Sequence, residues 1–260
     1  MFSVLRAEAR KLKNTTVGYL VPGILFLLLA SIFLAHTLDV HRLSELGRDP
    51  WPAYLRRVIT TYSMLFISPV CVLLVVGLLD LEKRTDAWTR LYVLPVSRGA
   101  IYWGKLLLII GLVTVLTVLF ALGVLLIGAT LAWFYPEYEL MYYKPDFMLL
   151  ADAVLRGVLS SLGIIGLQYL VGLGSRGSLP GLLLGLIGMI AGFVLSTTDL
   201  SIVYLFPYSY PLIVQDFGPF AVGHGSSSLF SWSTGLLGSI AWCGVCACGG
   251  YWLELRRQVY

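Results

Sequence analysis

Residues 100–134 read AIYWGKLLLIIGLVTVLTVLFALGVLLIGATLAWF, and this stretch decides the class of fold. It contains one charged residue, Lys105. A helix over this stretch would be about 52 Å long, which exceeds the ~30 Å hydrocarbon core of a bilayer. Two spans and a turn would need about 40 residues, so we predict one long helix that extends beyond the membrane.

The rest of the chain has the composition of a polytopic membrane protein. Its 260 residues are 58% hydrophobic and only 12% charged, whereas soluble domains carry about 25% charged residues. A soluble domain of this size could not hide so much apolar surface. The composition therefore excludes an ordinary soluble enzyme, and a net charge of +4 gives no indication of a nucleic-acid partner.

Six apolar stretches are long enough to cross a bilayer as helices. Lipid offers no hydrogen bonds to the backbone, and runs of this length without alternation exclude a barrel. We therefore predict an all-α, multi-pass membrane protein with a single transmembrane domain over residues 1–260. The predicted spans are Val17–Ala35, Val58–Leu79, Ala100–Phe134, Met148–Leu173, Leu179–Ser196 and Leu229–Leu253.

The basic residues predict the orientation of these spans. Of the 18 Lys and Arg residues, 12 fall on the side that holds both termini and 6 on the other side. The side with more basic residues faces the cytoplasm in most membrane proteins. Both termini are therefore expected in the cytoplasm.

Residues 1–15 have an amphipathic pattern. Apolar residues recur at helical spacing on one face and basic residues on another, which predicts a helix lying in the headgroup layer. The alternative is a basic anchor with no further role. The basic residues are Arg6, Arg10 and Lys13.

The connection between the second and third spans, residues 81–98, carries the most information. A charged cluster precedes Trp88, Leu91 and Tyr92, which share one face of a short helix. Pro95 disfavours helix at the preceding residue and ends this turn. An aromatic helix flanked by charges suits the docking of another protein, but a plain interfacial loop with belt aromatics fits equally well.

The pattern Glu82, Trp88, Leu91, Leu94-Pro95-Val96-Ser97-Arg98, Tyr102 and Lys105 resembles the cytoplasmic loop of permease subunits of type-2 ABC exporters. It is most similar to the branch of lantibiotic (bacteriocin) immunity transporters, although some relatives carry a Gly-Thr pair where this chain has Thr85-Asp86-Ala87. The resemblance implies six spans, an amphipathic N-terminal helix and a coupling helix that docks into a partner ATPase. The residues expected to make that contact are Glu82, Asp86, Trp88, Arg90, Leu91, Pro95 and Arg98.

The sequence contains no G-x-x-x-x-G-K-[ST] phosphate loop, so ATP and Mg²⁺ are expected on separate ATPase subunits, in two copies. The resemblance further implies a second permease, the same or a different chain, in a bacterial inner membrane. The expected activity is outward movement of an amphipathic, bacteriocin-like peptide or a lipid-like molecule. Two alternatives remain open: a complex doing mechanical or sensory work at the envelope, and an intramembrane enzyme.

Two patterns inside the predicted spans indicate contacts within the membrane. Asp152 and Arg156 are four residues apart, which fits a buried structural pair or, less readily, a contact with substrate. Small residues spaced by four favour close helix packing, within the chain or with a second permease. These residues are Gly181, Gly185, Gly188 and Gly192.

None of the remaining patterns in the sequence predicts a catalytic or metal-binding site. Residues 198–228 are expected to form an outer loop; its aromatic residues suit an interfacial belt, whereas the resemblance implies a region that folds back toward the membrane near the outer exit. Cys243, Cys246 and Cys248 look like a metal run, but a helix places them on different faces, so no metal site is expected. His36, His41 and His224 have no metal-binding or catalytic spacing, and no catalytic residues are predicted.

Overall fold

The computed structural model of the chain describes residues 15–38, 50–84, 98–136, 140–175, 177–198, 201–215 and 234–256. All regular elements in these ranges are helical, as predicted. Six helical stretches among the described residues are long and apolar enough to cross a membrane. They are Gly18–Leu38, Pro50–Leu81, Gly99–Phe134, Phe147–Gly174, Leu179–Ser196 and Thr234–Arg256.

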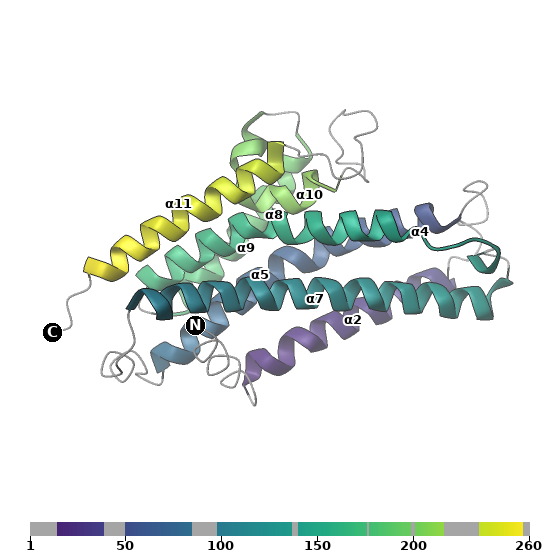
Figure 1. Cartoon of the computed structure of the whole chain (residues 1–260), viewed down its shortest axis with the longest axis horizontal. Coiled ribbons are helices and arrows are strands. Elements are labelled where there is room, and N and C mark those ends of the chain that lie inside the picture. The colour runs from purple at the N-terminus through teal and green to yellow at the C-terminus, as the bar shows by residue number, and fades with distance from the viewer. Residues whose placement is uncertain are drawn as a thin grey trace.

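The predicted long helix is α7, which runs unbroken over Arg98–Phe134. Figure 1 shows it extending along the whole bundle. Its 37 residues correspond to about 55 Å, so one of its ends projects beyond a bilayer of ordinary thickness. The single-helix prediction is confirmed.

The second span is longer than predicted. It begins at Pro50 as α4 (Pro50–Tyr62), passes through a π-helical turn, η1 (Ser63–Ile67), and continues as α5 (Ser68–Arg84). The prediction began at Val58 because Arg56 and Arg57 lower the local hydropathy, yet both arginines lie on the exposed face of an amphipathic helix. The π turn ends two residues before Pro69, which lacks an N–H donor, and it is a single irregular turn inside a longer helix, as most π turns are.

The other predicted spans correspond to single helices. These are α2 (Thr16–Leu38), α8 (Phe147–Gly174), α9 (Leu179–Ser196) and α11 (Thr234–Arg256). The start predicted for the last span, residues 229–233, lies outside the described residues. A short 3₁₀ turn, η3 (Leu140–Tyr142), precedes α8.

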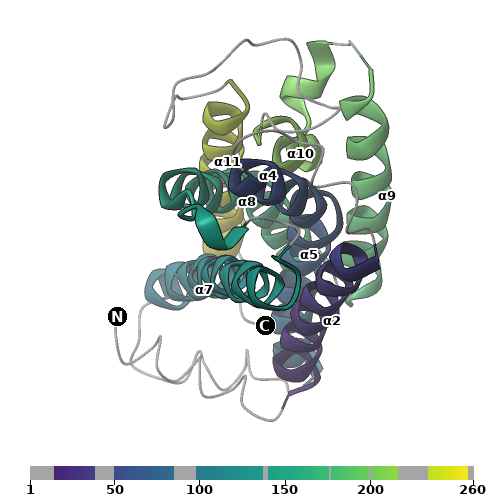
Figure 2. The same ribbon diagram turned by 90° about the vertical axis from the view of Figure 1, so that its right-hand side faces the viewer.

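Helix α8 is the central helix of the bundle. It packs against α5, α7, α9 and α11, and Figure 2, which looks along the bundle, places α5 and α8 between α9 on one side and α7 on the other. Small residues let α11 approach closely, since a Cβ at Gly166 would lie 2.8 Å from the Cα atom of Cys243. By contrast α2, α9 and α11 expose most of their apolar side chains, as expected for helices that face lipid.

The two ends of the bundle differ in their connections. At the end we call proximal, at the left of Figure 1, α5, α8 and α11 end and α7 and α9 begin. At the opposite, distal end, the segment after α9 folds back against the bundle as η4 (Ser201–Leu205), η5 (Pro207–Ser209) and α10 (Tyr210–Ile213). We call residues 201–215 the distal segment.

The distal segment contradicts the interfacial aromatic belt and folds back against the bundle, as the resemblance implies for this region. Tyr208 and Tyr210 are fully buried, and the side chain of Gln215 is buried as well. Tyr208 packs against α9 and reaches α8. These rings belong to the protein interior because the distal segment turns inward between the helices.

Candidate functional site

The predicted ATPase contact lies almost entirely outside the described residues. This applies to Asp86, Trp88, Arg90, Leu91 and Pro95. Glu82 belongs to the last turn of α5 and Arg98 begins α7, so the structure places the backbone at both borders of the segment. The basic residues expected in the N-terminal helix also lie outside the described residues; they are Arg6, Arg10 and Lys13.

At the upstream border, Lys83 connects α5 to the end of α8. Its ammonium nitrogen Nζ donates to the carbonyl oxygens of Gly172 at 2.6 Å and Ser175 at 2.8 Å, and to the Ser175 hydroxyl at 3.2 Å. The last carbonyls of a helix lack intrahelical partners and carry partial negative charge. A lysine ammonium suits this position, and sequence reasoning missed it because the partners are backbone atoms about 90 residues further along.

At the downstream border, Tyr102 connects α7 to two other helices. Its hydroxyl donates to the carbonyl oxygen of Ala247 in α11 at 2.7 Å, and its own carbonyl accepts a hydrogen bond from Tyr169 of α8 at 3.1 Å. The rings of Tyr102 and Tyr169 lie 5.2 Å apart between centroids. Both borders of the predicted coupling segment are thus attached to α8, and the downstream border is attached to α11 as well.

Two ionisable side chains near the proximal end are buried. Lys105 of α7 and Glu254 of α11 are 2% and 4% exposed. The sequence suggested only that they belong to the charged cytoplasmic side. Their burial places ionisable groups inside the bundle, where such groups are expensive and commonly functional.

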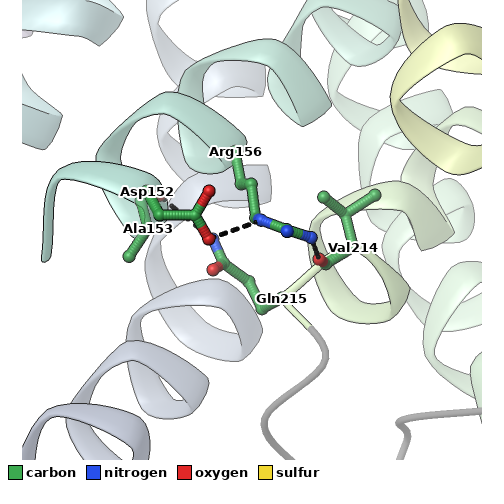
Figure 3. Close-up of polar contacts among 5 residues, drawn as sticks. All are labelled: Asp152, Ala153, Arg156, Val214 and Gln215. Atoms are coloured by element: carbon green, nitrogen blue, oxygen red, sulfur yellow. Dashed lines mark hydrogen bonds and ion pairs between the residues drawn. The ribbon is translucent and has the colours of Figure 1, made fainter. Parts of the chain in front are cut away.

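Asp152 and Arg156 form a buried ion pair toward the distal end. Arg156 Nε donates to Asp152 Oδ2 at 2.7 Å, and both side chains are almost completely buried. Figure 3 shows Arg156 reaching from α8 to the distal segment, where Nη1 donates to the Val214 carbonyl oxygen at 3.1 Å. The neighbouring Gln215 donates from Nε2 to the Ala153 carbonyl oxygen at 3.4 Å.

A second polar contact between α8 and the distal segment lies deeper in the bundle. Gln168 Nε2 donates to the Tyr208 hydroxyl at 2.7 Å and to the Gly181 carbonyl oxygen at 3.2 Å. Burial raises the pKa of the Tyr208 phenol to about 12, so this hydroxyl remains neutral at physiological pH. Among the described residues, Gln168 Oε1 has no hydrogen-bond partner although it is buried.

The four glycines of α9 are buried on the face that meets α5, Gln168 and Tyr208. A Cβ at Gly181 would lie 2.8 Å from Val76 of α5, and one at Gly192 would lie 2.8 Å from the Tyr208 backbone. Gly185 faces Val72, and Gly188 faces the Tyr208 ring. The neighbour of this glycine face is therefore within the same chain.

The described residues offer no group of three or more His, Cys, Asp or Glu side chains placed to hold a metal ion. Along α11, Cys243 is half-buried, Cys246 is buried and Cys248 is exposed, so the helix turns them to different surroundings. Buried polar side chains bond mainly to backbone carbonyls and to one another. Such contacts hold helices together and can be exchanged when helices move.

Six candidate spans, one of them the central helix α8 with its buried ion pair, define a multi-pass membrane protein. The chain belongs to the ABC-2 family of transporter proteins, whose family pattern matches residues 4–192. The match covers the first four spans and most of the fifth. No curated protein and no solved structure matches the chain significantly.

Family membership sets the general role of the chain. ABC-2 membrane domains are permeases that lack an ATPase domain and pair with ABC ATPase subunits, which bind the ATP. The chain is therefore the permease component of an ABC transporter. The matched family does not indicate what is transported.

Proposed function

We propose that this permease exports an amphipathic peptide or a lipid-like molecule, using ATP hydrolysed by two separate ATPase subunits. The observation that carries the proposal is the family match over residues 4–192, in a chain with six candidate spans. A second permease, a copy or a different chain, completes the complex. The bacteriocin-type cargo is supported by the resemblance of residues 81–98 to the immunity transporters.

In this proposal the proximal end faces the cytoplasm of a bacterial cell and meets the ATPase. The excess of basic residues on that side supports this orientation, 12 against 6. The coupling contact is made by residues 81–98, with Trp88 and Leu91 as apolar anchors and Arg90 as a charged partner. The amphipathic helix of residues 1–15 lies on the inner headgroup layer and follows the motion of the first span.

The buried polar contacts of α8 support a transport role over an intramembrane enzyme. Arg156 is bonded both to the Asp152 carboxylate and to the distal segment, so this buried pair is engaged in holding helices together. Arg156 is paired with a carboxylate of its own helix and bonded to a carbonyl oxygen of the distal segment, and this favours one arrangement of the two elements. The ATP-driven change is expected to exchange these contacts.

The test is transport in vesicles that contain the permease together with its ATPase. Two fluorescent probes distinguish the cargo classes: a cationic amphipathic peptide and a phospholipid with a labelled headgroup. Export predicts ATP-dependent movement of one probe, and none with an ATPase that binds ATP but does not hydrolyse it. If ATP is hydrolysed by the complex and neither probe moves, the proposed cargo is wrong and the mechanical or sensory role gains support.

A further inference from the structure

Lys83 connects the helix that leads into the predicted coupling segment with the end of the central helix. Its side chain is half-buried, and it donates to three oxygen atoms on Gly172 and Ser175. A lysine ammonium has three N–H donors, so this geometry ties the end of α5 to α8 from several directions. The attraction between the ammonium and the helix terminus strengthens the connection.

The contact is not needed to end α8, because the helix closes its own terminus. The Ser175 backbone N–H donates to Val171 at 3.0 Å, and the Ser175 hydroxyl lies 3.2 Å from the Gly172 carbonyl oxygen. Lys83 is added to an end that is already capped by local hydrogen bonds. What it contributes is a connection between two helices.

Helix α8 extends from this contact to the distal segment. Its 28 residues form a helix about 42 Å long. Gln168 lies one turn from Gly172 and bonds Tyr208, and Arg156 lies further along and bonds Val214. A displacement applied at Lys83 therefore reaches both contacts with the distal segment through one continuous helix.

We propose that Lys83 is the coupling residue that transmits movement of the ATPase-bound segment to α8. This inference rests on the proposed function, since it requires an ATPase at the proximal end. When nucleotide binding moves the end of α5, the Lys83 contacts move the end of α8 and the start of α9 with it. Without the ammonium group, the ATPase still binds but α8 no longer follows.

A label at Gly177 measures this movement directly. A Cβ at Gly177 meets no atom within 4 Å, so a cysteine there fits without disturbing its neighbours. In a background lacking the four native cysteines, Gly177→Cys carries an environment-sensitive fluorophore. The complex of the labelled permease and its ATPase is then mixed with a non-hydrolysed ATP analogue, and the fluorescence change is recorded.

The variants are Lys83→Met, which removes the charge and keeps the length, and Lys83→Arg, which keeps the charge. Lys83→Met is expected to retain the ATPase in the complex but to reduce the fluorescence change by about fivefold or more. Lys83→Arg should restore at least part of it, because a guanidinium also donates to helix carbonyls. Lys144→Met, at an exposed distal lysine, is the matched control and should behave as the unchanged chain.

Two results would overturn the inference. An undiminished fluorescence change in an assembled Lys83→Met complex would show that α8 moves without this contact. Failure of both Lys83 variants to assemble would assign the residue to folding instead of coupling. If the unchanged permease itself does not bind an ATPase, the proposed function fails first, and the coupling role falls with it.

Discussion

Arg156 of α8 donates a hydrogen bond to the carbonyl oxygen of Val214, at 3.1 Å across 58 residues of sequence. The same guanidinium is paired with Asp152 at 2.7 Å. One side chain thus joins an ion pair inside α8 to the segment that folds back at the distal end. The distal segment is therefore held to α8 through a buried, charge-assisted hydrogen bond.

Replacing Arg156 by Met should destabilise the permease by about 3–5 kcal/mol, because a buried carboxylate loses its paired cation. Asp152→Asn should also destabilise it. The double variant should be more stable than the sum of the two single effects predicts, with a coupling energy of about 1–3 kcal/mol. Unfolding of the purified chain in mixed detergent measures these values, and strictly additive effects would contradict the ion pair.

Gly192→Ala should destabilise the permease because the new Cβ would lie 2.8 Å from the Tyr208 backbone. Overpacking of this kind costs about 1–3 kcal/mol. Gly111→Ala is the matched control, since its Cβ meets nothing within 4 Å and the change favours the helix by about 0.4–1 kcal/mol. Thermal unfolding of both variants gives the comparison; equal stability would mean that α9 does not lie against the distal segment.

Trp51→Phe should loosen the connection between α7 and α8. The indole Nε1 of Trp51 donates to the carbonyl oxygens of Leu140 at 3.0 Å and Tyr143 at 3.1 Å. Losing about 1 kcal/mol of hydrogen bonding should raise local opening roughly fivefold. Limited chymotrypsin cleavage after Tyr142, which is 82% exposed, measures that opening.

The control for this experiment is Trp133→Phe, because Trp133 is 73% exposed whereas Trp51 is buried. Its cleavage rate should match that of the unchanged chain. Equal rates for the Trp51 and Trp133 variants would mean that the indole contacts do not hold the connection in place.

The proposed orientation predicts which surfaces react from outside the cell. A cysteine in place of Tyr142, at the distal end, should react with a membrane-impermeant maleimide in intact cells. A cysteine in place of Gly177, at the proximal end, should react only after the membrane is opened. The reverse pattern would place the proximal end outside and exclude an ATPase contact there.

Hydropathy located the spans because the backbone of a membrane helix must satisfy its own hydrogen bonds, which requires long apolar runs. It failed at the start of the second span, where Arg56 and Arg57 interrupt the run. The helical spacing of Trp51, Tyr54, Leu55 and Val58, all buried, carried the missing signal. A search for amphipathic periodicity before each span would have found α4.

Tertiary contacts to backbone atoms could not be predicted from the sequence. From the sequence alone, Lys83 looks like an ordinary charged residue of a loop. Its partners are backbone carbonyl groups, and these leave no pattern in the order of side chains. Tyr208 reads as an interfacial aromatic, because nothing local tells a belt residue from one that turns inward. Asp152 and Arg156 were recognisable because an i, i+4 pair within one helix is a local pattern.

The most direct test of a permease driven by a separate ATPase is co-purification of that ATPase with the tagged chain. The unchanged chain and Tyr142→Ala, altered at the distal end, should retain equal amounts. The variant combining Trp88→Ala with Arg90→Glu should retain about thirtyfold less, because it loses an aromatic anchor and reverses a contact charge. Full retention of the ATPase, with its hydrolysis rate unchanged, would contradict coupling through residues 81–98.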